Sequence, residues 1–304
     1  MSATGASPAA VLAPEQAGVA GPVARRRAPS AWAAFARDRL ALGAGVYLVG
    51  LALVAMVGPS FEPYAFDQQN LSATYQPPSA AHPLGTDNLG RDVLVRIVHG
   101  TRVSLFIGLA AQAAEVVLGL LLGSVAAYYG GRLDGIVMRT ADLLLAFPPL
   151  LLAILLTGIL GPSIPNIIFA IVVSGWPAMA RTVRGEVLVL KTREFTEAAR
   201  ALGVRDSRII LRHLAPNTLH IVAVRATLGI GVVIMIEATL SFLGIGVQPP
   251  MPSLGGMISE AFKFLRSYPL QIVFPSLVLS SIVLAFNFFG EGLADSMSPW
   301  TRNR

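Results

Sequence analysis

The sequence of 304 residues has no cysteine and only two lysines, and few of its side chains carry charge. Without cysteine the chain has no disulfide framework, no thiolate metal site and no cysteine nucleophile. Charged residues make up 13% of the chain and apolar residues 54%, whereas soluble domains carry about 25% charged residues. This balance predicts a membrane protein.

Motifs of several enzyme classes are also missing. Neither Lys191 nor Lys263 follows a glycine, so the sequence has no phosphate-binding Gly-x-x-x-x-Gly-Lys-Ser/Thr loop. It has no His-Glu-x-x-His and no Gly-x-Ser-x-Gly motif, and its four histidines lack ligand-type spacing. We therefore expect no catalytic site, metal or cofactor on this chain.

The N-terminal segment differs in composition from the rest. Residues 1–30 are mostly alanine, proline and glycine, which cannot bury a core, so we expect a disordered tail. No basic start followed by an apolar run precedes Arg25, and a signal peptide is not expected. Trp32 and Phe35 lie one helical turn apart, which fits either a short helix on the membrane surface or a solvated lead-in.

Six apolar stretches follow the tail, and each predicts one membrane-spanning helix, because a span needs about 20 apolar residues. They cover residues 40–57, 103–129, 143–160, 164–179, 219–247 and 270–293. Pro148 and Pro149 remove backbone donors in the third stretch, so we expect a kink that lets this span rock. The sequence thus predicts an all-α polytopic membrane protein.

Lysine and arginine are unequally distributed between the two sides of the predicted membrane. Seventeen lie in the N-terminal tail, in the loops after the second and fourth spans and at the C-terminus, and five lie on the opposite side, with Arg225 inside the fifth span. Because these residues stay preferentially in the cytoplasm, we expect both termini there. Topology explains the basic charge, so nucleic-acid binding is not expected.

The expected organisation is therefore a tail and four further segments. These are the disordered tail (1–30), an interfacial segment with the first span (31–58), an outer loop (59–101), a five-helix core (102–295) with a cytoplasmic loop at 186–217, and a cytoplasmic C-terminus (296–304).

The cytoplasmic loop at 186–217 predicts two short helices at an angle. Thr196 can cap a helix that starts at Glu197, and Gly203 permits the positive φ that ends it. The apolar face of this helix comprises Phe195, Ala198, Ala199 and Leu202. Such a face needs a partner, although a hairpin resting on lipid headgroups is an alternative.

The second short helix is expected after Gly203. Asp206 or Ser207 can cap it, and it should run to His213, with Pro216 close behind.

The spacing of this loop carries a resemblance. Glu197-Ala198-Ala199, three residues, Gly203, nine residues and His213-Leu214-Ala215-Pro216 resemble the EAA loop of permease subunits of bacterial binding-protein-dependent ABC importers. The resemblance implies that the loop docks in a cleft of an ATPase subunit and transmits its closure. It assigns this coupling role to Glu197, Ala198, Ala199, Leu202, Gly203, His213 and Pro216.

Three further segments, at 82–92, 128–149 and 237–250, are similar to the second permease of the dipeptide, oligopeptide and nickel importers. The resemblance implies six transmembrane helices of the type I importer fold in the bacterial inner membrane. It also implies a second homologous permease, two ATPase subunits that hold ATP and Mg, and an extracytoplasmic substrate-binding protein. Di- or oligopeptides are the expected substrate, and nickel or another small solute is the alternative.

Three acidic residues are candidates for the solute pathway or a subunit interface. Glu115 and Glu237 lie inside apolar stretches, where an ionisable side chain usually faces a bundle interior or a wet pathway. Each is alternatively a packing carboxyl at the subunit interface. Asp142 lies three residues after Arg139 and can pair with it.

Small residues in the fifth span predict tight packing against a partner subunit. They are Gly229, Gly231, Ala238, Gly244 and Gly246. Two other classes of function stay open: an intramembrane enzyme, which would need a positioned nucleophile and base, and a channel or scaffold, which would need no ATPase-docking loop.

Overall fold

The computed structural model describes residues 35–297. Within this range the secondary structure is helical and contains no strand, apart from one isolated bridge between Thr86 and Asp92. The predictions for the tail at 1–30, for Trp32 and for the segment from residue 298 onward lie outside the described residues.

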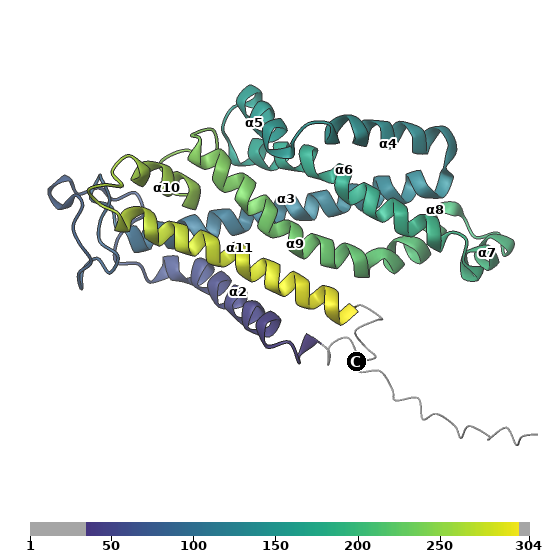
Figure 1. Cartoon of the computed structure of the whole chain (residues 1–304), viewed down its shortest axis with the longest axis horizontal. Helices are drawn as coiled ribbons and strands as arrows, with labels where there is room; N and C mark the ends of the chain where they lie inside the picture. Colours follow the sequence, from purple (N-terminus) through teal and green to yellow (C-terminus); the bar gives the residue numbers. More distant parts are fainter. Residues whose placement is uncertain (1–34, 298–304) are drawn as a thin grey trace, which may run out of the picture.

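Long apolar helices run side by side along the longest axis of the molecule (Figure 1). They are α2 (Arg39–Val57), α3 (Val93–Tyr129), α6 (Ile164–Leu190), α9 (Ala215–Phe242) and α11 (Leu270–Met297). Five helices of the described chain are long and apolar enough to cross a membrane, or six spans result if one bent pair counts as a span. The all-helical membrane class predicted from the sequence is confirmed at this level.

The bent pair is α4 (Gly131–Leu145) and α5 (Pro149–Leu160), which meet at 88°. Pro148 and Pro149 thus interrupt the predicted third span more sharply than the expected kink, and α4 begins at Gly131, twelve residues before the predicted start at 143. Two consecutive prolines disfavour helical conformation in the residue before each of them and lack backbone donors. Pro149 begins α5 and Pro148 precedes it in an extended conformation, so the chain breaks instead of bending.

Two helices extend well beyond their apolar stretches. Helix α3 begins at Val93, ten residues before the predicted start, and the side chain of Asp92 caps it by accepting a hydrogen bond from the Val95 N–H. Helix α6 continues through Pro177 to Leu190. Hydropathy marks the part of a helix that lies in lipid, and polar turns at its ends escape that signal.

Short elements occupy the two ends of the bundle. One end carries the loop between α2 and α3, with the turns η1 (Gly58–Ser60) and η2 (Leu71–Ala73), and α10 (Leu254–Phe262). The other end carries α7 (Glu194–Ala201), α8 (Asp206–Ile209) and the π-helical turn η3 (Ile210–Leu214). We call these the loop end and the hairpin end.

The core lies where α3 packs along α6 and against α9. Ile107, Ile167 and Ile171 are fully buried there, and Ile234 and Ile282 fill a second cluster beside α11. The surface of α2 facing away from the bundle carries exposed Val46, Leu53 and similar side chains, as a lipid-facing helix requires.

Candidate functional site

At the hairpin end, α7 and the start of α8 form a compact turn around Gly203. Helix α7 ends at Ala201, Leu202 is its C-cap, and Gly203 has φ +71°. The Gly203 N–H donates to the carbonyl of Arg200 at 2.9 Å. A residue with a side chain adopts this backbone conformation only with strain, so the predicted role of Gly203 in ending the helix is confirmed.

Thr196 does not cap α7. The helix already begins at Glu194, and Thr196 is fully buried within it. Its hydroxyl donates to the Leu190 carbonyl at 2.9 Å. This bond ties α7 to the last turn of α6, and the predicted start at Glu197 is wrong by three residues.

The second short helix is also different from the prediction. Neither Asp206 nor Ser207 makes a capping hydrogen bond, and α8 runs through the π turn directly into α9. The whole stretch Asp206–Phe242 is one helix of 37 residues. Pro216 lies just after the π turn Ile210–Leu214, where the regular α-helical hydrogen-bond pattern is already interrupted. The hairpin is thus continuous with a helix that enters the bundle.

Tyr128, at the end of α3, anchors the hairpin. Its hydroxyl donates to Asp206 at 2.5 Å, and the guanidinium of Arg200 lies 4.9 Å from the centre of its ring. Lys191 adds a bond from its Nζ to the carbonyl of Ala127 at 2.7 Å. The sequence gives no local sign of this anchor, because its residues come from separate segments of the chain.

An exposed apolar surface remains on the hairpin. It consists of Phe195, Leu202 and Leu211, which are 42%, 83% and 60% exposed. We call these three residues the hairpin surface. A hollow of about 730 Å³ beside it is lined by basic side chains together with Leu202 and Leu211.

The predicted coupling residues lie around this surface, with one exception. Glu197 and Ala198 are exposed, and His213 is half-buried. Ala199 is 8% exposed and packs into the chain's own core. The prediction that Ala199 belongs to an unpartnered face is therefore wrong. A helix of two turns has one side against its own protein, and Ala199 lies on that side.

Asp142 pairs across helices. It accepts a hydrogen bond from Arg181 of α6, and Asp134 of α4 accepts two from Arg184 at 2.6 Å each. The predicted pair with Arg139 is not formed, because Asp142 faces α6. These ion pairs hold α4 against α6.

Glu237 is fully buried in the middle of the bundle. Its two oxygens accept hydrogen bonds from Ser104 of α3 at 2.7 Å and from Ser241 at 2.8 Å. Two hydroxyl donors satisfy a buried carboxyl group within this one chain.

Glu115 has a different environment. It lines a cavity of about 510 Å³ between α3, α6 and α9, close to the break between α4 and α5. Among the described residues, its one hydrogen bond comes from Gln112 at 3.4 Å. Arg225 of α9 lines the same cavity. The structure therefore brings together two charges that are 110 positions apart in the sequence.

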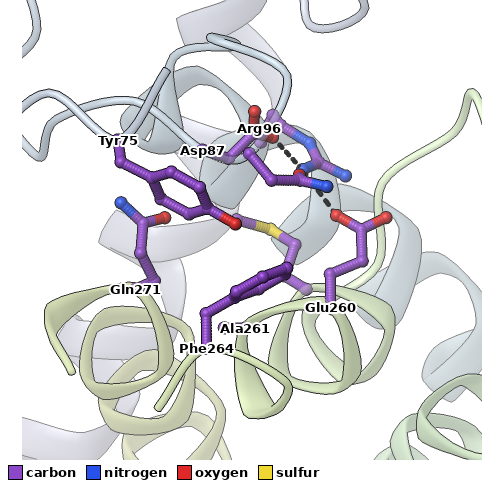
Figure 2. Close-up of a pocket in the computed structure, with 9 residues that line it drawn as sticks. Tyr75, Asp87, Arg96, Glu260, Ala261, Phe264 and Gln271 are labelled. Atoms are coloured by element: carbon purple, nitrogen blue, oxygen red, sulfur yellow. Dashed lines mark hydrogen bonds and ion pairs between the residues drawn. The ribbon is translucent and has the colours of Figure 1, made fainter. Parts of the chain in front are cut away.

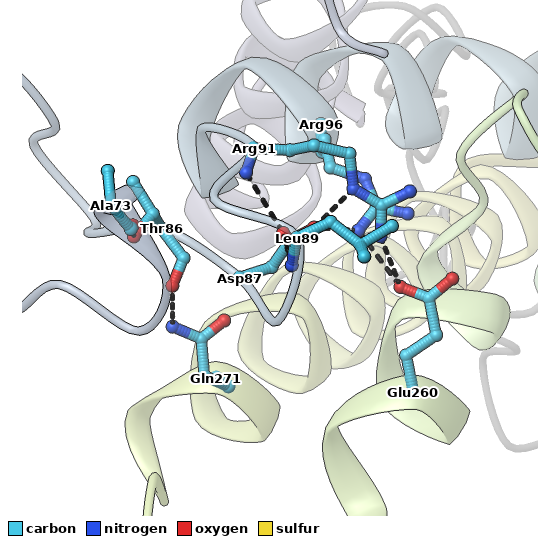
Figure 3. A network of polar contacts seen from close by, with 8 residues as sticks. All are labelled: Ala73, Thr86, Asp87, Leu89, Arg91, Arg96, Glu260 and Gln271. Atoms are coloured by element: carbon cyan, nitrogen blue, oxygen red, sulfur yellow. Dashed lines mark hydrogen bonds and ion pairs between the residues drawn. The ribbon is translucent and has the colours of Figure 1, made fainter. Parts of the chain in front are cut away.

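At the loop end, a polar network holds the segment before α3 against α10 (Figure 3). Asp87 accepts hydrogen bonds from the Leu89 N–H at 2.8 Å, from Arg91 Nε at 2.7 Å and from Arg96. Glu260 of α10 accepts from both arginines, at 3.0 and 2.9 Å. We call Asp87, Arg91, Arg96 and Glu260 the loop-end network.

A small pocket of about 20 Å³ borders this network (Figure 2). Tyr75 stacks on Tyr268 with ring centres 3.9 Å apart and contacts Phe264. Burial raises the pKa of Tyr75, and the nearby Tyr268 and Asp87 raise it further. The pocket has no room for a substrate. Within residues 35–297 no group of acidic and histidine side chains is arranged to hold a metal ion.

Two families match the sequence. The family described as "Binding-protein-dependent transport system inner membrane component" matches residues 119–303. The family described as "N-terminal TM domain of oligopeptide transport permease C" matches residues 29–78. The first match covers more than half of the chain, and residues 79–118 lie between the two matches.

Curated relatives align over most of the chain. The dipeptide transport system permease protein DppC of Alkalihalophilus pseudofirmus is 40% identical over 86% of both chains. The oligopeptide transport system permease protein OppC of Bacillus subtilis is 40% identical over 88% of both. The glutathione transport system permease protein GsiD of Pectobacterium atrosepticum is 41% identical over 88% of this chain and 89% of the relative.

Proposed function

Because the chain belongs to the family of binding-protein-dependent transport system inner membrane components, we propose that it is a permease subunit of an ATP-driven importer for di- or oligopeptides. As a member of this family it is a multi-pass protein of the bacterial inner membrane. The peptide substrate is taken from the relatives, whose names specify dipeptides, oligopeptides and glutathione.

One observation carries the proposal. The hairpin surface is apolar and exposed, and it lies on a turn that continues without a break into α9. Exposed apolar side chains next to basic ones at a helix end are typical of a docking surface. We propose that an ATPase subunit covers the hairpin surface.

The proposed topology has six crossings, in which α4 and α5 together form the third. Both termini lie in the cytoplasm with the hairpin end, and the loop end faces outward. The support is the distribution of lysine and arginine, of which seventeen lie on the proposed cytoplasmic side and five on the opposite side.

ATP and Mg are held by two separate ATPase subunits in this proposal, since the sequence has no phosphate-binding loop. A second homologous permease completes the pathway, and an external binding protein delivers the peptide to the loop end. Membrane lipid surrounds the apolar faces.

The proposed mechanism is alternating access. Closure of the ATPase subunits on ATP pushes the hairpin, and the continuous helix Asp206–Phe242 carries this displacement into the bundle. Helix α9 borders the cavity of Glu115 and Arg225, so its movement changes access to that cavity. After hydrolysis the peptide leaves into the cytoplasm.

The test substitutes Gly203 by proline. Proline fixes φ near −65°, which is incompatible with the observed +71°, and it removes the hydrogen bond to Arg200. We expect ATP-dependent dipeptide uptake in membrane vesicles to be abolished, while membrane insertion is unchanged.

Gly161→Pro is the matched control. Gly161 also ends a helix with a positive φ, +85°, and its N–H also donates to a carbonyl, that of Thr157 at 2.9 Å. It follows α5, outside the hairpin, so this variant should keep co-purifying with the ATPase. Normal uptake by Gly203→Pro, or equal loss of the ATPase in both variants, contradicts the proposal.

A further inference from the structure

The lining of the cavity between α3, α6 and α9 includes a buried acidic side chain and an exposed basic one. Glu115 and Arg225 line it, and Gln112 lies one helical turn from Glu115. Within the described chain, Arg225 makes no hydrogen bond and no ion pair, and Glu115 accepts only the 3.4 Å bond from Gln112. Charged groups inside a membrane bundle are normally paired or face a functional cavity.

Gln112 adds an independent sign of an incomplete site. It is 4% exposed, and its buried Oε1 has no hydrogen-bond partner in the described part of the chain. A buried amide oxygen without a donor is destabilising. A ligand with an N–H group would satisfy it.

Two glycines make room for these side chains. A Cβ added at Gly175 of α6 would lie 1.9 Å from Oε1 of Glu115, and one added at Gly229 of α9 would lie 2.0 Å from Oε1 of Gln112. Any larger residue at either position would displace the polar group. The fifth span was predicted to use Gly229 against a partner subunit, and here it accommodates a side chain of α3 instead.

We propose that this cavity is a solute-binding subsite on the transport path and that it accepts a small zwitterionic peptide. The carboxylate of Glu115 pairs with the peptide's ammonium group, Arg225 pairs with its terminal carboxylate, and the Gln112 amide bonds the peptide group. The inference rests on the proposed importer function and specifies where its substrate is held. The volume of about 510 Å³ lies within the range of roughly 300–1,000 Å³ typical of small-molecule sites.

The apolar lining of the cavity explains why peptides with different side chains would be accepted. Leu145, Val232 and Ile236 surround the charged groups with apolar surface. Charge pairing fixes the two ends of the peptide, whereas apolar contact is non-directional and discriminates weakly between side chains. The subsite therefore recognises the backbone of the peptide.

The test uses the absence of cysteine. Thr182→Cys introduces one thiol in the cavity lining, and Thr192→Cys introduces one on an exposed residue just beyond the end of α6, outside the lining. Each variant is assembled with its partner subunits, and alkylation of the thiol is followed by mass spectrometry with and without dialanine. We expect dialanine to slow alkylation at position 182 several-fold and to leave position 192 unchanged.

Two comparisons make the test specific for charge. N-acetyl-dialanine amide lacks both terminal charges and should give no protection at the same concentration. Glu115→Gln or Arg225→Gln, in the Thr182→Cys background, should raise the half-protecting dialanine concentration roughly tenfold, as expected for loss of a hydrogen bond to a charged group. Arg139→Gln, an exposed arginine of α4 outside the cavity, is the control and should change nothing.

Each result decides the inference. Equal protection by the charged and the capped peptide overturns the zwitterionic subsite. Absence of protection with normal peptide uptake overturns the subsite and leaves the importer function standing. Absence of both protection and uptake, with the assembly intact, contradicts the importer function itself.

Discussion

The loop-end network and the cavity of Glu115 both bring acidic and basic side chains together, but they satisfy them differently. In the network, two acids face two arginines, and Asp87 alone accepts bonds from two backbone N–H groups and two guanidinium groups. In the cavity, Arg225 makes no hydrogen bond or ion pair with any described residue, and Glu115 has one long bond. Within the described chain every charged side chain of the first arrangement is paired, although Nε of Arg96 has no hydrogen-bond partner, whereas the second arrangement contains no ion pair.

The difference separates charges that hold the fold from charges that are available for binding. A balanced buried network contributes to a single geometry and is strongly destabilising to break. An unpaired charge in a cavity lowers stability and persists where function requires it. The two regions therefore predict opposite responses to substitution.

The largest effect is expected for Asp87→Asn. It leaves Arg91 and Arg96 with Glu260 as their remaining acid in the network, and breaking a buried pair costs about 3–5 kcal/mol. The apparent unfolding temperature of the purified protein, followed by tryptophan fluorescence in detergent, should fall clearly. Asp67→Asn, in an exposed position of the same loop, is the control. If both variants unfold at the same temperature, the network does not hold the loop end together.

A smaller loss is expected for Ser104→Ala, which removes one of the two donors to Glu237. Leaving a buried acceptor without its partner costs about 1–3 kcal/mol. Ser124→Ala is a matched control, because Ser124 is 1% exposed and its hydroxyl has no partner. The same thermal measurement should place Ser124→Ala near the unmodified protein. Equal losses in the two variants would show that the bond to Glu237 contributes nothing.

The sequence predictions are accurate where neighbouring residues decide the structure and wrong where contacts between distant segments decide it. Residues 40–57 predict α2 (Arg39–Val57) to within one residue, because the apolar run coincides with the helix. The predicted start of α3 is too late because its first turns carry the polar residues Arg96 and His99, which are typical of a loop. In the fold these side chains pair with Asp87 and Glu62, respectively, and only tertiary structure shows that.

The candidate sites divide in the same way. Gly203 could be predicted, since a positive φ at the end of a helix is a local requirement with a local sequence signal. Glu115 was recognisable as an acid in an apolar run, but its meeting with Arg225 depends on how α3 packs against α9. The surroundings of Ala199 and Asp142 were mispredicted for the same reason: the neighbours that decide them belong to other helices.

The smallest effect on stability is expected for Glu115→Gln. The uncharged amide keeps the size of the side chain and removes an ionisable group that has only one long hydrogen bond, so stability should change by less than about 1 kcal/mol or rise slightly. Peptide uptake should fall at the same time, if the cavity binds the peptide ammonium group. Thermal unfolding and uptake are measured on the same preparation. A clear loss of stability without a change in uptake would show that Glu115, like Asp87, stabilises the fold and does not bind the peptide.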